Sequence, residues 1–190
     1  MSLLGALVIL GLKFGAYAVT GSVSLLSDAA ESLVNLVAAV ALIIAIGVAA
    51  TPPDYRHPYG HAKAEYISSV LEAALIIVAA VVIGVSAIRR LMDPQPLEQL
   101  GLGLALAATA MVVNGLLALR LFRVAKATDS AALEANATHL MTDVWTSVGA
   151  MAGVGLVRLT GWLPLDPLVA LVVAGNIVVA GIRVMRRRSE

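Results

Sequence analysis

Long apolar stretches, separated by short polar or glycine- and proline-containing segments, dominate the chain. A helix needs about 20 apolar residues to cross the hydrocarbon core of a bilayer. The pattern predicts six membrane-spanning helices, at residues 3–19, 25–49, 64–88, 97–122, 131–159 and 165–185. The breaks between them fall at residues 20–22, 51–53, 93–96 and 161–167. We therefore predict an all-α membrane protein, built as a single six-helix transmembrane bundle.

The amino-acid composition indicates that most of the protein surface contacts lipid rather than water. Of 190 residues, 60% are hydrophobic and 13% are charged, whereas soluble domains are about half apolar and a quarter charged. A soluble enzyme is excluded on this ground, and the chain contains no His-Glu-x-x-His motif of a membrane metalloprotease. We expect no enzymatic activity. The net charge of +1 provides no basic field for nucleic acid.

Basic residues predict the orientation of the bundle in the membrane. Six spans place both termini on one side, and lysine and arginine favour the cytoplasmic side. Nine basic residues lie at one set of helix ends, against three (Arg89, Arg90 and Arg158) at the other. The nine are Arg56, Lys63, Arg120, Arg123, Lys126, Arg183, Arg186, Arg187 and Arg188. Both termini are therefore predicted to be cytoplasmic; Lys13 lies within the first span and is not counted.

Polar residues inside the predicted spans are the candidate functional groups. A charge at the bilayer centre costs at least ~2.5–3.5 kcal/mol, so such residues need a reason to be there. Asp28, Glu31 and Asn35 share one face of the second span, and His139 and Asp143 lie four apart in the fifth. On facing helices, these groups offer up to four nitrogen and oxygen ligands, which suits tetrahedral zinc. Because the chain has no cysteine, a thiolate metal site is excluded.

Structural roles remain open for several of these residues. His139 could bond to a neighbouring helix instead of a metal, and Asp28 could be a membrane-edge residue or a gating or accessory ligand. Glu72 in the third span is either a packing partner or a group that handles protons. Asn114 in the fourth span is interpreted as a hydrogen bond between helices rather than a ligand.

A second candidate site lies in the loop after the second span. This loop holds Asp54, His57 and His61, and so two of the three histidines of the chain. Proline and glycine between the histidines would bend the loop so that both rings could converge. The alternatives are a metal site and a solvated loop that precedes a helix.

Three segments resemble the cation diffusion facilitator family. Residues 24–35 (SLLSDAAESLVN) resemble the second helix of that family, residues 57–65 (HPYGHAKAE) its loop signature, and residues 135–143 (ANATHLMTD) its fifth helix. The likeness extends over nearly the whole chain, in the same order. It implies a proton-coupled exporter of divalent cations, usually Zn²⁺, expected in the cytoplasmic (inner) membrane of a bacterium.

The resemblance also implies specific site residues. The transport site of the family falls here on Glu31, Asn35, His139 and Asp143, and its loop site on Asp54, His57 and His61. The family commonly has His or Asp followed by Asp on the second helix. Glu31 and Asn35 depart from this pattern, which could relax the preference for zinc toward Mn²⁺, Fe²⁺, Co²⁺ or Cd²⁺.

A C-terminal cytoplasmic domain, through which many members dimerise, is not evident in the sequence. A homodimer would then rely on the membrane helices, where Gly11-x-x-x-Gly15 and Gly149-x-x-x-Gly153 permit close approach.

Ligation requires neutral His139 and ionised Glu31 and Asp143, so metal binding would expel protons. The rival functions are a proton-coupled carrier of organic cations and a membrane scaffold without transport activity.

Overall fold

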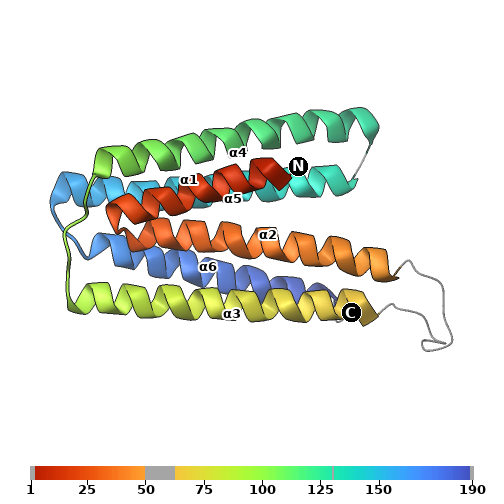
Figure 1. The fold of residues 1–190 in the computed structure, drawn as a ribbon, viewed down its shortest axis with the longest axis horizontal. Coiled ribbons are helices and arrows are strands. Elements are labelled where there is room, and N and C mark those ends of the chain that lie inside the picture. The colour runs from red at the N-terminus through yellow and green to blue at the C-terminus, as the bar shows by residue number, and fades with distance from the viewer. Residues whose placement is uncertain (1–2, 50–62, 130, 189–190) are drawn as a thin grey trace.

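The computed structural model describes residues 3–49, 63–129 and 131–188, and all of its regular structure there is helical. The helices are α1 (Leu3–Thr20), α2 (Val23–Ala49), α3 (Lys63–Met92), α4 (Leu100–Thr128), α5 (Ala131–Thr160) and α6 (Leu165–Arg188). They run up and down as one elongated bundle (Figure 1). The predicted fold class, a six-helix bundle, is confirmed.

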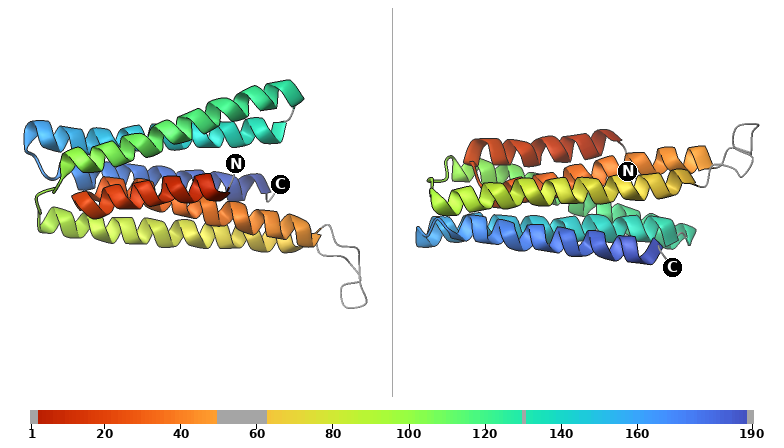
Figure 2. Two further views of the ribbon diagram at one scale, coloured as in Figure 1. Left: turned by 45° about the horizontal axis from the view of Figure 1, so that its top comes forward. Right: turned by 90° about the horizontal axis from the view of Figure 1, so that it is seen from below.

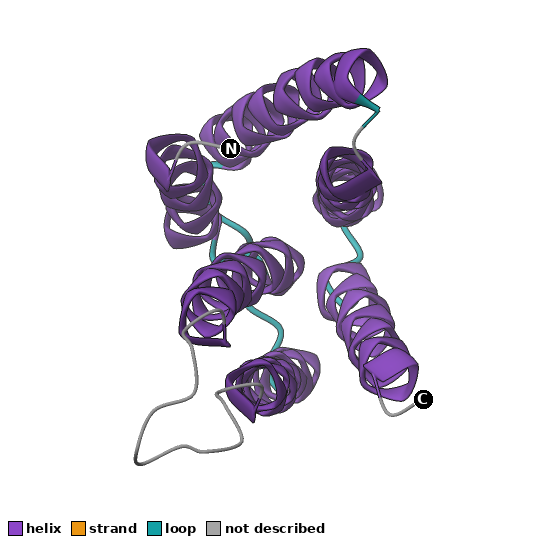
Figure 3. Ribbon diagram, turned by 90° about the vertical axis from the view of Figure 1, so that its right-hand side faces the viewer, coloured by secondary structure: helices purple, strands orange, loops and turns teal. Residues whose placement is uncertain are grey.

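The helices are arranged around α2 and α5. Helix α2 packs against α1, α3, α5 and α6, while α5 packs against α4, α6 and α2. Helix α4 closes the bundle against α1 and α5, as the view along the helices shows (Figure 3). Both ends of the described chain lie toward the same end of the bundle, away from the turns that join α1 to α2, α3 to α4 and α5 to α6 (Figure 2). A site built between α2 and α5 is therefore enclosed by the other helices.

The bundle surface suits a lipid environment. Four helices are long and apolar enough to cross a bilayer, and the apolar parts of α1 and α6 are shorter. Large aliphatic side chains point outward, such as Ile77 (61% exposed) and Val172 (74% exposed). Alanines such as Ala16, Ala110 and Ala150 are fully buried instead. Small residues inside and large ones outside are typical of membrane bundles, in which helices associate by close packing.

Helices α3 and α4 extend furthest beyond the predicted spans. Helix α3 continues to Met92 and α4 runs from Leu100 to Thr128, whereas apolarity alone predicts 64–88 and 97–122. The length of an apolar run indicates only the part of a helix that crosses the hydrocarbon core. The helix itself can continue into the interfacial region on either side. Helix α4 begins later than predicted because residues 97–99 belong to the turn, where Gln99 adopts a left-handed conformation (φ 39°).

The start of α2 is held by a carboxylate from another helix. Asp166 of α6 accepts hydrogen bonds from the backbone N–H groups of Val23 (2.7 Å) and Ser24 (3.2 Å) and from the Ser24 hydroxyl (2.6 Å). The preceding turn uses Gly21 at φ +66°, a conformation that glycine adopts without strain. Arg90 of α3 donates to the carbonyl of Gly21, which gives this basic residue a structural role at the less basic end. These contacts fix α2 relative to α3 and α6.

Close helix approach depends on two buried glycines. A Cβ on Gly103 of α4 would lie 2.0 Å from Thr20 Cγ2 of α1, and one on Gly153 of α5 would lie 3.0 Å from Val169 Cβ of α6. Gly153 of the predicted Gly149-x-x-x-Gly153 motif therefore serves packing within the chain.

Candidate metal site

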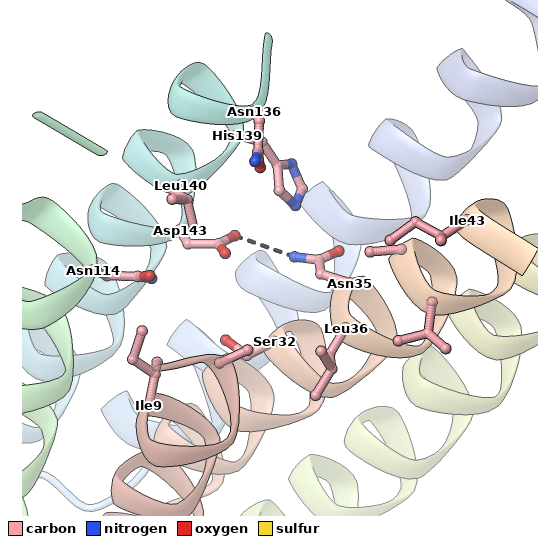
Figure 4. A pocket seen from close by; sticks show the side chains of 13 residues that line it. Ile9, Ser32, Asn35, Leu36, Ile43, Asn114, Asn136, His139, Leu140 and Asp143 are labelled. Carbon is pink, nitrogen blue, oxygen red and sulfur yellow. Dashed lines mark hydrogen bonds between the residues drawn. The ribbon is translucent and has the colours of Figure 1, made fainter. Parts of the chain in front are cut away.

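A cavity of about 270 Å³ lies between α1, α2, α4 and α5 (Figure 4). This volume has room for a metal ion together with several water molecules. The cavity is lined by aliphatic side chains and by six polar residues: Ser32, Asn35, Asn114, Asn136, His139 and Asp143. Three of the four predicted transport ligands, Asn35, His139 and Asp143, therefore share one cavity.

Asp143 and Asn35 form a direct contact between α5 and α2 inside the cavity. The Asn35 amide donates a hydrogen bond of 3.2 Å to Asp143 Oδ1, and Asp143 is 6% exposed (Figure 4). His139 lies one turn before Asp143 on the same face of α5, as the spacing of four predicts. Asp143 lies about 18 Å along α5, a helix of 30 residues and about 45 Å. The carboxylate is thus well inside the bundle, while the exposed His139 lies nearer the cavity mouth.

Glu31 lies one turn before Asn35 on α2 but does not line the cavity. Its Oε2 atom is buried and has no hydrogen-bond partner in the described part of the chain. The Glu31 carboxylate lies within electrostatic reach of Asp143, Asp28 and Lys13. A buried carboxylate oxygen without a partner is costly, so this atom is chemically available to a cation.

Asp28 is engaged by a different set of partners. Lys13 Nζ of α1 lies 2.8 Å from Asp28 Oδ1, and the Ser147 hydroxyl of α5 donates to both oxygens at 2.9 and 3.0 Å. Lys13 also donates to the Ser32 hydroxyl at 2.8 Å. Lys13 and Asp28 are each 2% exposed. Their opposite charges compensate one another, and the cluster joins α1, α2 and α5 on the side of Asp143 away from His139.

The remaining predicted site residues lie apart from the cavity or outside the described residues. Glu72 is partly buried on α3 and does not line the cavity. Asp54, His57 and His61 fall within residues 50–62, which lie outside the described ranges. Their predicted loop site therefore stays a prediction.

A metal ion in this cavity would need ligands other than histidine and carboxylate side chains. In the described ranges, no group of three His, Asp or Glu side chains gathers closely enough to hold a metal ion. The cavity itself holds one of each, His139 and Asp143, beside three asparagines. Further ligands would have to come from amide oxygens, the Ser32 hydroxyl, water or a reoriented Glu31.

Several residues that shape the site escaped the sequence-based prediction. Lys13 is basic in an apolar helix, a signal that a partner must lie nearby. Asn136 lies three residues before His139 and thus on the same face of α5. Ser147 and Ser32 carry no comparable signal, because serine is common in membrane helices.

Comparison with known proteins places these motifs in a family context. The profile of the cation efflux transmembrane domain matches residues 1–189, which confirms the resemblance described above. An uncharacterised transporter of Synechocystis is 54% identical over 98% of this chain. The cation-efflux pump FieF of Shewanella oneidensis is 31% identical over 89% of this chain. A probable cation efflux system protein of Mycobacterium tuberculosis is 33% identical over 84% of this chain.

The matched part of these relatives is only part of their length. The chain spans 60% of the Synechocystis protein, 57% of the Shewanella protein and 48% of the mycobacterial protein. The similarity therefore concerns their transmembrane portion.

Proposed function

Since the chain belongs to the cation efflux family, we propose that it exports a divalent metal cation, Zn²⁺ in the first instance, in exchange for protons. The proposed transport ligands are Asn35, His139, Asp143 and Glu31. The observation that carries the proposal is the shared cavity of Asn35, His139 and Asp143, two helices supplying an amide, an imidazole and a carboxylate.

Glu31 completes the proposed set through its unpaired carboxylate oxygen. A change of side-chain rotamer in this residue, one turn from Asn35, would bring an anionic oxygen to the metal. The result is a site of imidazole, two carboxylates and an amide, which fits the ligand types of zinc. The two negative charges match the two positive charges of the ion.

Proton coupling follows from the same ligands. His139 coordinates a metal only when neutral, and Asp143 and Glu31 bind best when ionised, so metal and protons compete for one site. Protons entering from outside would displace the metal, and release of protons inside would prepare the site for the next ion. Exchange of this kind needs no additional coupling residue, although Glu72 is a candidate for an accessory role.

The cavity extends toward one end of the bundle. Its lining extends from Asp143 toward Ile43 and Asn136, in the direction of the end where both termini lie (Figures 1 and 4). On the opposite side, the Lys13–Asp28 cluster and a buried layer with Leu25, Ala150 and Val154 separate it from the end where α1 turns into α2 and α5 into α6. With cytoplasmic termini, as the basic residues predict, the site would face inward. Release to the other side requires this layer to open, as alternating access demands.

The remaining expectations belong to the same proposal. The loop residues Asp54, His57 and His61 would form a second metal site at the cytoplasmic end. The working unit would be a homodimer formed through the membrane helices, in the cytoplasmic membrane of a bacterium. The relatives from Synechocystis and Shewanella are bacterial proteins, which supports this location.

Calorimetric titration of Zn²⁺ into the purified chain tests the proposed site. We expect H139A and D143A each to weaken one binding event by about 10–100-fold or more, the range seen when a metal site loses a supporting group. The same event should release protons, seen as a binding heat that depends on the buffer. H57A is expected to affect only the loop site, and D93N, in the exposed turn after α3, neither site. Unchanged Zn²⁺ affinity in an H139A/D143A double variant would contradict the proposal.

A further inference from the structure

Asn114 of α4 brings an unpaired oxygen to the cavity. The residue is 1% exposed, and its Oδ1 atom is buried without a hydrogen-bond partner among the described residues. It lines the same cavity as Asp143 and His139, and its side chain points from α4 toward the side where Asp143 lies (Figure 4). The sequence predicts that Asn114 bonds to another helix, but its carbonyl oxygen makes no such bond within residues 3–49, 63–129 and 131–188.

An unpaired amide oxygen inside a membrane bundle needs a compensating partner. Burial removes water from the carbonyl, and a missing hydrogen bond leaves the full cost of that desolvation. The Asn35 amide reaches Asp143, so Asn35 and Asp143 satisfy each other in part, whereas Asn114 Oδ1 does not share in that bond. A cation in the cavity would supply the missing partner, because amide carbonyl oxygens are good ligands for hard divalent ions.

We propose that Asn114 is a specificity-determining ligand of the metal site. Its amide oxygen would allow the site to bind cations that take more than four ligands. This inference rests on the proposed transport function. Two observations carry it: the buried, unpaired Oδ1, and the presence of only one histidine and one carboxylate in the cavity.

The donor set determines which ions benefit. Tetrahedral zinc is satisfied by four ligands, of which imidazole and carboxylate already supply the strongest. Mn²⁺ and Co²⁺ accept higher coordination numbers, and Mn²⁺ favours oxygen donors. An extra neutral oxygen from α4 therefore helps Mn²⁺ and Co²⁺ more than Zn²⁺. The Asn114 oxygen thus reduces the difference in affinity between Zn²⁺ and the other two ions, while His139 and Asp143 remain the main ligands.

The position of Asn114 also ties α4 to the transported ion. Asn35 lies on α2, and His139 and Asp143 lie on α5, so the predicted ligands alone leave α4 without contact to the metal. With Asn114 as a ligand, binding draws α4 toward the α2–α5 pair. Release would then require α4, as well as α2 and α5, to give up a bond to the ion.

The test compares the N114L and N176L variants of the full chain. Both also carry H57A and H61A, so that the measured metal binding comes from the intramembrane site alone. Asn176 is exposed on α6 and does not line the cavity, which makes N176L a matched control. We expect N114L to weaken Mn²⁺ and Co²⁺ binding by about tenfold or more, the lower range for losing a supporting group, and Zn²⁺ binding less. Bound Co²⁺ should change from a weak visible spectrum, typical of higher coordination, to the intense spectrum of four-coordinate Co²⁺. N176L should behave as the parent.

Three further outcomes separate the possibilities. If N114L binds all three ions as the parent does, with the same Co²⁺ spectrum, the role of Asn114 is refuted, while loss of binding in H139A still supports the transport site. If H139A binds as the parent does, the proposed function itself fails. If N114L does not fold, N114D decides: a carboxylate oxygen there should tighten Mn²⁺ binding relative to Zn²⁺, and an unchanged ratio of the two affinities overturns the inference.

Discussion

The side chain of Asn35 determines how many negative charges the candidate site carries. As an amide, it donates to Asp143 Oδ1 at 3.2 Å and so stabilises that carboxylate without adding a negative charge. An aspartate at the same position could not donate this bond when ionised. The metal-free protein would then hold two facing carboxylates, and a bound cation would be needed to bridge them.

The substitution N35D therefore has opposite expected effects on the metal-free and metal-bound protein. We expect the metal-free form to lose about 1–3 kcal/mol of stability, because a buried carboxylate loses its donor. Zn²⁺ should restore stability and raise the unfolding temperature by more than it does in the parent. Thermal unfolding in detergent, with and without Zn²⁺, measures both effects. A smaller Zn²⁺-induced shift in N35D than in the parent would argue against Asn35 as a ligand.

Sequence reasoning reaches part of the site at the residue scale. His139 and Asp143 can be selected because their spacing of four places them on one face of a helix. Their partners across the helix interface depend on how each helix is rotated, which spacing within one helix does not define. For this reason Asn114 is assigned to helix packing from the sequence, and Lys13 is not assigned a partner at all.

At the scale of helices, the Lys13–Asp28 cluster connects α1, α2 and α5 beside the site. Both charged groups are almost fully buried, and Ser147 and Ser32 provide the additional hydrogen bonds that a buried ion pair requires. The cluster occupies a face of α2 on which Asp28, Glu31 and Asn35 follow one another. Asp28 is thereby compensated by Lys13, whereas Asn35 lines the cavity and Glu31 lies one turn from it without such a partner.

Removing one member of this pair should be far more harmful than removing both. We expect K13M or D28L to destabilise the protein by about 3–5 kcal/mol, because each leaves a buried charge without a partner. The double variant K13M/D28L should recover a large part of that loss, giving a clear coupling energy in a double-mutant cycle. Unfolding of the four proteins in detergent measures it. Additive losses would mean that the two charges do not compensate each other.

Helix positions follow from the sequence more readily than helix contacts. The lengths of the apolar runs predict all six helices, since crossing a bilayer sets a minimum length. The cap that Asp166 provides for α2 joins residues more than 140 positions apart in the chain. No local pattern indicates it, and the same holds for the contact of Gly103 with Thr20.

At the scale of the whole molecule, the cavity extends toward the end of the bundle where both termini lie, and packed side chains separate it from the opposite end. The charged groups nearest the closed side, Lys13 and Asp28, are paired with each other, whereas Glu31 beside the cavity and Asn114 in its lining each carry a buried oxygen without a partner in the described part of the chain. This asymmetry is what a carrier needs in a state that accepts an ion from one end. A scaffold whose polar residues only join helices would have no use for unpaired buried oxygens.

The most direct test of this account is Zn²⁺ uptake into proteoliposomes with an acidic interior. The parent protein and D93N should take up Zn²⁺ faster than protein-free liposomes do, and a protonophore should abolish the stimulation by the pH gradient. The H139A/D143A variant should fall to the level of protein-free liposomes, because the metal and the exchanged protons share these ligands. Parental Zn²⁺ uptake in that variant would contradict the account.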